Sequence, residues 1–145
     1  IVNKYLQVVK KANVNIAEIG FRSLKNDDGF KGAAAFATDE YIDSLTIPRG
    51  LLIAVMINAS EIIKEGKVEF KSLNKLVPKI KKNSNVDIIR IACHFEEFKI
   101  IIKHIQKLKD KGYKVGVNLM QIGDRTEKEI ENAAELAIPA TGNKC

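Results

Sequence analysis

The sequence predicts an α/β fold in which about four parallel strands alternate with helices, an arrangement that fits part of a (β/α)8 barrel. Two patterns carry this prediction. Short runs rich in Ile and Val are apolar almost throughout, and longer segments carry an apolar stripe at helical spacing. The two patterns alternate along the chain, as parallel strands joined by right-handed crossovers require. A small doubly wound domain has the same alternation, so periodicity alone does not separate these two architectures.

In the first half of the chain the pattern indicates helix, strand, helix and strand. Leu6 and Val9 fall on one apolar side of the opening segment, which indicates a helix. The polar, glycine-containing stretch Ser23–Phe36 has the composition of a substrate-covering loop. Pro48 and Gly50 mark a turn into the next strand. The expected elements are helices over Val2–Ala12 and Thr38–Leu45, and strands over Ile16–Phe21 and Leu52–Asn58.

The second half repeats the alternation. Its clearest helix has an apolar stripe from Phe98 to Leu108, with lysines on the other side, and Gly112 ends it. Thr126 and Glu129 have the spacing of a capping box, so the last helix begins there. The expected elements are helices over Phe70–Lys81, Phe98–Lys111 and Glu127–Ala137, and strands over Asp87–Cys93 and Lys114–Met120.

The composition argues against a nucleic-acid-binding, membrane-spanning or secreted protein. The 145 residues include 24 Lys and Arg against 18 Asp and Glu, a net charge of +6, but the lysines are spread over helix faces and tryptophan is absent. We therefore expect no nucleic-acid partner. The longest uncharged apolar run, Leu51–Ala59, is shorter than the roughly 20 residues of a membrane helix. The cysteines Cys93 and Cys145 form no disulfide framework, and no leader opens the chain. We expect one cytoplasmic structural unit over residues 1–145, without a membrane partner.

Polar residues interrupt or follow each predicted strand. Glu18 and Arg90 lie inside apolar runs, where an unpaired charge is costly. Strand exits in α/β sheets and barrels carry the reactive groups, and polar residues gather at these exits. They are Arg22, Asn58, His94, Asn118 and Gln121. Structural roles are open as well: Glu18 and Arg90 could form only an ion pair, and His94 could cap the next helix. Cys93 alternates with its neighbours and is expected in the core.

Three ordered motifs resemble the HMGL-like metallolyases, the superfamily of 3-hydroxy-3-methylglutaryl-CoA lyase and 4-hydroxy-2-oxovalerate aldolase. Ile-Ala-Glu-Ile-Gly-Phe-Arg, residues 16–22, resembles the second strand of that family. Ile-Arg-Ile-Ala-Cys-His-Phe-Glu-Glu, residues 89–97, is similar to its fourth strand. Residues 112–120 resemble the fifth strand, and the resemblance covers about Val2 to Ala137.

The resemblance implies a (β/α)8 barrel that makes or breaks a carbon–carbon bond of a 2-oxo acid, such as a 4-hydroxy-2-oxo acid. A divalent metal, Mg or Mn, acts in that family as a Lewis acid. By position, the resemblance makes Glu18 and Arg22 catalytic, and makes Asn58, Arg90, His94, Asn118 and Gln121 substrate-binding. The family's Arg-Asp and His-x-His metal motifs are missing, so about half of a barrel without metal ligands is expected. The alternative is a non-catalytic α/β module that self-associates or pairs with a complementing chain.

Overall fold

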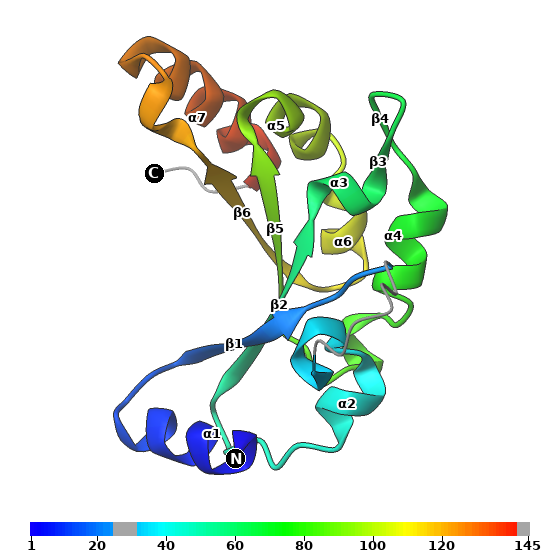
Figure 1. Cartoon of the computed structure of the whole chain (residues 1–145), viewed down its shortest axis with the longest axis vertical. Coiled ribbons are helices and arrows are strands. Elements are labelled where there is room, and N and C mark those ends of the chain that lie inside the picture. The colour runs from blue at the N-terminus through cyan, green and yellow to red at the C-terminus, as the bar shows by residue number, and fades with distance from the viewer. Residues whose placement is uncertain (25–31, 142–145) are drawn as a thin grey trace.

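The computed structural model describes residues 1–24 and 32–141. Its main sheet has four strands, which fan out across the molecule (Figure 1). All four are parallel, and they lie side by side in chain order. They are β1 (Ile16–Phe21), β2 (Leu52–Asn58), β5 (Ile88–His94) and β6 (Lys114–Met120). This order confirms the predicted α/β class and matches consecutive strands of a barrel, because a doubly wound sheet would reverse direction at a switch point.

The helices cover one face of this sheet. They are α1 (Val2–Lys11), α2 (Asp39–Asp43), α3 (Ala59–Ile62), α4 (Phe70–Leu76), α5 (Phe95–Ile102), α6 (Gln106–Asp110) and α7 (Glu127–Thr141). Short 3-10 turns lie at η1 (Ala33–Phe36), η2 (Lys81–Asn83) and η3 (Ile122–Asp124). Ile53 and Ile89 of the sheet are fully buried in one hydrophobic core, to which each of the seven helices contributes at least one side chain. Burial of these apolar side chains is the main stabilising force on this face.

The opposite face of the sheet is called here the inner face. The strand register shows which residues lie on it. Glu18 pairs with Ala54, Met56 with Arg90, and Arg90 with Gly116. One row further along, at the carboxyl ends of the strands, Asn58, Ala92 and Asn118 lie in register. Because side chains alternate along a strand, these residues share the face that carries no helix among the described residues.

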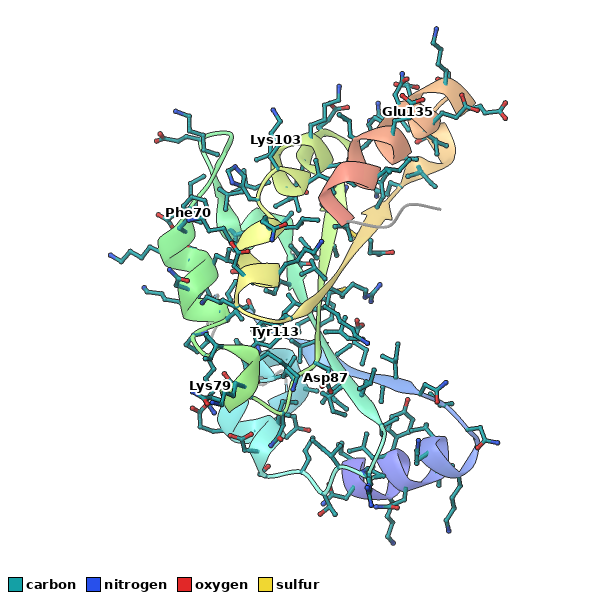
Figure 2. All side chains as sticks on the ribbon, turned by 180° about the vertical axis from the view of Figure 1, so that it is seen from behind. Phe70, Lys79, Asp87, Lys103, Tyr113 and Glu135 are labelled. Atoms are coloured by element: carbon teal, nitrogen blue, oxygen red, sulfur yellow. The ribbon has the colours of Figure 1, made fainter. Side chains whose placement is uncertain are left out.

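Three local features differ from the sequence predictions. α4 ends at Leu76 and not at Lys81, because Pro78 disfavours helical backbone at the residue before it. The helix expected over Phe98–Lys111 begins earlier, at Phe95, and divides into α5 and α6 around His104. The ring of His104 packs edge-on against Phe70 at this break, 5.4 Å between centroids, and Figure 2 shows Phe70 at the start of α4.

The sequence prediction also missed a small hairpin, β3 (Ile63–Lys64) with β4 (Lys67–Val68). Its turn residues Glu65 and Gly66 both have positive φ, 49° and 72°, as a two-residue type I′ turn requires. The Glu65-Gly66 pair was the signal in the sequence from which this turn could have been predicted. None of the described helices is long and apolar enough to cross a membrane.

Candidate functional site

Glu18 and Arg90 meet on the inner face of the sheet. Arg90 donates from Nε to Glu18 Oε2 and from Nη2 to Glu18 Oε1, both at 2.6 Å. Such a two-point contact fixes the plane of both groups. The carboxylate also raises the pKa of the Arg90 guanidinium by hydrogen bonding to it. The predicted ion pair is therefore confirmed, and it links β1 to β5 across β2.

This pair is not sealed from solvent. The side chains of Arg90 and Glu18 are 36% and 30% exposed, at a shallow surface lined also by Ile16, Ala54 and Gly116. A cost of 3–5 kcal/mol for breaking it, the scale of a buried pair, is therefore too large for the chain as described. The pair is open to solvent because no element among the described residues covers the inner face.

We expect Glu18→Gln to lower the free energy of unfolding by about 1 kcal/mol, since water screens the pair and the amide keeps one acceptor. Urea denaturation measures this loss. Glu131→Gln, at an exposed position of α7, is the matched control and should change it by less than about 0.5 kcal/mol. A loss of about 3 kcal/mol for Glu18→Gln would show that the inner face is covered in solution.

Asn58 and His94 line a cavity of about 220 Å³ at the carboxyl edge of the sheet, together with Ser60, Ala92 and Met120. Strand direction brings them together, since Asn58 ends β2 and His94 ends β5. Asn118 lies in register with Ala92, on the same face. Three of the predicted substrate-binding residues therefore belong to one edge of the inner face. Gln121 follows β6 in the left-handed conformation, is exposed, and is absent from the cavity lining.

The backbone around His94 is fixed by the start of α5. His94 precedes this helix, and its N–H donates to Glu97 Oε2 at 2.8 Å. A carboxylate in the first turn also complements the positive end of the helix dipole. The predicted helix-capping position of His94 is thus confirmed, and it does not exclude a binding role, because the residue still lines the cavity.

Arg22 does not lie with the other predicted site residues. It is 4% exposed on the helix-bearing face, where Nε donates to Ala37 O, Nη1 to Leu76 O and Nη2 to Asp39 Oδ1, each at 2.9 Å. The cause is an irregularity in β1: register shifts between Glu18 and Gly20. A bulge reverses the alternation of side chains, so Phe21 takes the inner face and Arg22 the opposite one. The prediction that Arg22 gathers with the other polar residues of the strand exits is therefore wrong.

Sequence reasoning overlooked Glu61, which belongs to α3 and is 6% exposed. Its carboxylate accepts hydrogen bonds from Ser23 Oγ at 2.5 Å and from the Leu24 N–H at 3.1 Å. It therefore ties the exit of β1 to the exit of β2. Of the covering loop predicted over Ser23–Phe36, residues 25–31 lie outside the described residues, and Ala33–Phe36 form the 3-10 turn η1. A carboxylate three positions after Asn58 was the only signal.

Cys93 is fully buried in the helix-side core, as predicted, and burial raises the pKa of its thiol to about 11. The thiolate needed for nucleophilic attack is therefore scarce at neutral pH. Among residues 1–24 and 32–141, no three His, Cys, Asp or Glu side chains gather closely enough to hold a metal ion. Both Glu18 oxygens accept hydrogen bonds from Arg90. The described residues do not fit the divalent metal that the family resemblance implies.

Comparison with known proteins gives one informative match. A crystal structure described as "the N-terminal domain of a putative aldolase from Bacteroides vulgatus" superposes with a TM-score of 0.66 at 19% sequence identity. The match covers 95% of this chain and 53% of that one, so this chain spans about half the length of its structural neighbour. Neither a protein-family model nor a curated protein matches the chain. The likeness establishes an aldolase-like fold, and a particular family and reaction remain proposals.

Proposed function

We propose that this chain supplies the substrate-binding side of a lyase that acts on the carbon–carbon bond of a 2-oxo acid, as in the HMGL-like metallolyases. The observation that carries the proposal is that polar side chains from three strands lie together on the inner face of the sheet. Arg90, held by Glu18, lies on the inner face, and Asn58 and His94 lie at its carboxyl edge. The aldolase-like fold supports this proposal, because barrel enzymes place their chemistry at that edge.

The chemistry of these groups suits a 2-oxo acid. Glu18 occupies Nε and Nη2 of Arg90, while Nη1 has no hydrogen-bond partner among the described residues. That nitrogen would donate to the substrate carboxylate, and Glu18 would act by orienting the guanidinium. The Asn58 and Asn118 amides would donate to the 2-oxo oxygen. The imidazole of His94 would accept the proton of a 4-hydroxyl group as the C3–C4 bond breaks, which releases an aldehyde and leaves the bonding electron pair in the enolate of the 2-oxo acid. The imidazolium would then return the proton to C3 of the enolate.

The steps above use only residues of this chain, and none of them runs through a metal ion. The resemblance implies Mg or Mn as cofactor, and that metal would stabilise an enolate oxygen when bound. Its ligands would have to come from outside the described residues. Arg22, expected to be catalytic from the resemblance, is proposed instead as a structural residue, because its guanidinium donates to Ala37, Leu76 and Asp39 on the helix-bearing face.

Titration of the purified chain with 2-oxobutanoate tests the proposal, with NMR signals of the Arg90 and His94 side chains as the readout. We expect 2-oxobutanoate to shift both signals, and butanoate, which lacks the oxo group, to shift them at least tenfold more weakly. Arg90→Met should abolish the shift of the His94 signal, which is the readout compared between variants, since it removes the donor for the carboxylate. Lys103→Met removes one exposed positive charge on the helix side and should leave it intact; Figure 2 shows Lys103 on the outer surface. An equal response in both variants would contradict the proposal.

The alternative function, a non-catalytic module that pairs with itself or with a partner chain, rests on a different observation. β1 and β6 are the outer strands of the described sheet, and each has one edge without a neighbouring strand. Such edges invite pairing with another strand. Sedimentation over a hundredfold range of concentration distinguishes self-pairing, which gives a saturable dimer, from a monomer.

A further inference from the structure

We propose that a cavity on the helix-bearing face of the sheet binds a small neutral molecule in which a primary amide is attached to an apolar body. The cavity lies on the opposite side of the sheet from Glu18 and Arg90. The inference therefore goes beyond the proposed lyase function and does not depend on it. It rests on a buried carboxylate oxygen without a partner, on the charges around that oxygen, and on the apolar walls of the cavity.

The cavity has a volume of about 190 Å³ and lies where the exit of β1, the start of α2 and the end of α4 meet. Arg22 holds these segments together. Its guanidinium donates to Asp39 at the start of α2 and to the Leu76 carbonyl oxygen at the end of α4. Figure 1 shows α2 and α4 on the same side of the sheet. Because buried hydrogen bonds fix the surrounding segments, the cavity has a defined shape.

Asp39 gives the cavity an acceptor that nothing in the fold uses. The residue is 3% exposed, and its Oδ1 accepts hydrogen bonds from Arg22 Nη2 at 2.9 Å and from Ser84 Oγ at 2.8 Å. Its Oδ2 is buried too and has no hydrogen-bond partner among the described residues. A buried acceptor without a donor costs free energy, and a donor on a ligand would remove that cost. The ligand must therefore carry an N–H or O–H group.

The charges around this oxygen favour a neutral donor over a cation. Arg22 already neutralises Asp39, because their charged groups lie 2.9 Å apart. The exposed lining residues Glu40 and Lys75 add one negative and one positive charge, which also balance. A cationic ligand group at Oδ2 would be desolvated beside the Arg22 guanidinium without a net negative charge to compensate it. The donor of the ligand is therefore neutral.

A primary amide matches both members of the buried ion pair. Its N–H would donate to Asp39 Oδ2. Its carbonyl oxygen would accept from Arg22, because a guanidinium has five N–H groups and three of them donate to Ala37, Leu76 and Asp39. A hydroxyl group has only one atom with which to make both contacts, whereas the amide offers donor and acceptor on separate atoms, as the ion pair does.

The walls of the cavity define the rest of the ligand. Much of the remaining lining is apolar and comes from Leu24, Phe36, Leu76 and Pro78. Such walls, with few polar groups, suit an apolar body such as an aromatic ring. Contact with the covered Oδ2 requires a small movement of the lining. Leu24 is 38% exposed and Lys75 is exposed, so their side chains are free to change rotamer, as side chains at binding sites commonly do.

Titration of the full chain with four probes of similar shape tests the proposal. Benzamide is neutral and has the N–H donor, acetophenone lacks the donor, benzamidinium is a cation, and benzoate is an anion. The NMR signals of the Ser23, Glu40 and Leu76 backbone amides are the readout. We expect benzamide to bind with a Kd of about 1 mM, as suits a probe of this size, and each other probe to bind at least tenfold more weakly. No response to benzamide, or a smaller difference between the probes, would overturn the proposal.

A matched pair of variants tests the contact with Oδ2. Asp39→Asn keeps an oxygen for Arg22 and Ser84 but puts an N–H donor in the place of Oδ2. Benzamide should then bind at least tenfold more weakly, and acetophenone, which brings an acceptor, should bind more tightly than to the native chain. Asp43→Asn makes the same change in α2 outside the cavity lining, and both affinities should stay unchanged.

Equal benzamide affinities of the two variants would overturn the proposal. If circular dichroism shows that Asp39→Asn does not fold, the order of the four probes on the native chain decides alone. None of these measurements depends on the binding of a 2-oxo acid, so the lyase proposal and this one succeed or fail separately.

Discussion

Arg22→Met is expected to lower the free energy of unfolding by about 3–5 kcal/mol, the scale for removing one partner of a buried ion pair. Arg22 and Asp39 are 4% and 3% exposed, and their charged groups lie 2.9 Å apart. Without the guanidinium, the Asp39 carboxylate keeps a single hydrogen bond, from Ser84 Oγ at 2.8 Å. Among the described residues, its Oδ2 has no hydrogen-bond partner even before the substitution. The carbonyl oxygens of Ala37 and Leu76 would also lose their donors.

Chemical denaturation of Arg22→Met and of Arg49→Met measures this effect against a matched control. Arg49 is exposed in a turn, so its replacement should cost less than about 0.5 kcal/mol. The double variant Arg22→Met/Asp39→Leu should be more stable than Arg22→Met, because it no longer buries an uncompensated charge. A cost below about 1 kcal/mol for Arg22→Met would mean that water reaches this network.

Periodicity was sufficient to predict the sheet, because its four strands are short runs rich in Ile and Val that alternate with segments of helical spacing. The bounds of β1, β2 and β6 agree with the predicted ones, and β5 is displaced by one residue. The predicted ends of the helices were less accurate, because a helix end depends on single residues such as the proline that follows α4. Strand direction alone also brought Asn58 and His94 to one edge of the sheet.

The side-chain assignments failed where tertiary contacts decide orientation. Glu18 and Arg22 are four positions apart and would share a face in a regular strand, but the irregularity in β1 separates them. Gly20 was the local signal, because an isolated glycine inside a strand pattern is typical of a bulge or of a close backbone approach, and the sequence prediction did not use it. The exposure of the Glu18–Arg90 pair was unpredictable, since it depends on what covers the inner face.

Gly20→Ala should destabilise the fold by about 3 kcal/mol or prevent folding, as overpacking against a rigid backbone does. A Cβ atom at Gly20 would lie 2.0 Å from the carbonyl oxygen of Ala34 and 2.8 Å from its carbonyl carbon. Since both atoms belong to the backbone of η1, no rotamer change relieves the contact. The segment after η1 is itself held to β1, because the Ala37 N–H donates to Phe21 O at 2.7 Å.

Displacing η1 would also disturb the Arg22 network, because Ala37 O accepts from Arg22 Nε. Thermal unfolding followed by circular dichroism measures the loss. Gly123→Ala is the matched control, since nothing lies within 4 Å of its added Cβ, and its midpoint should stay within a few degrees of the native one. If Gly20→Ala unfolded at the same temperature as Gly123→Ala, η1 would not pack against β1 in solution. In that case the bulge would lack the contact that requires glycine, and the assignment of Arg22 to the helix-bearing face would lose its structural support.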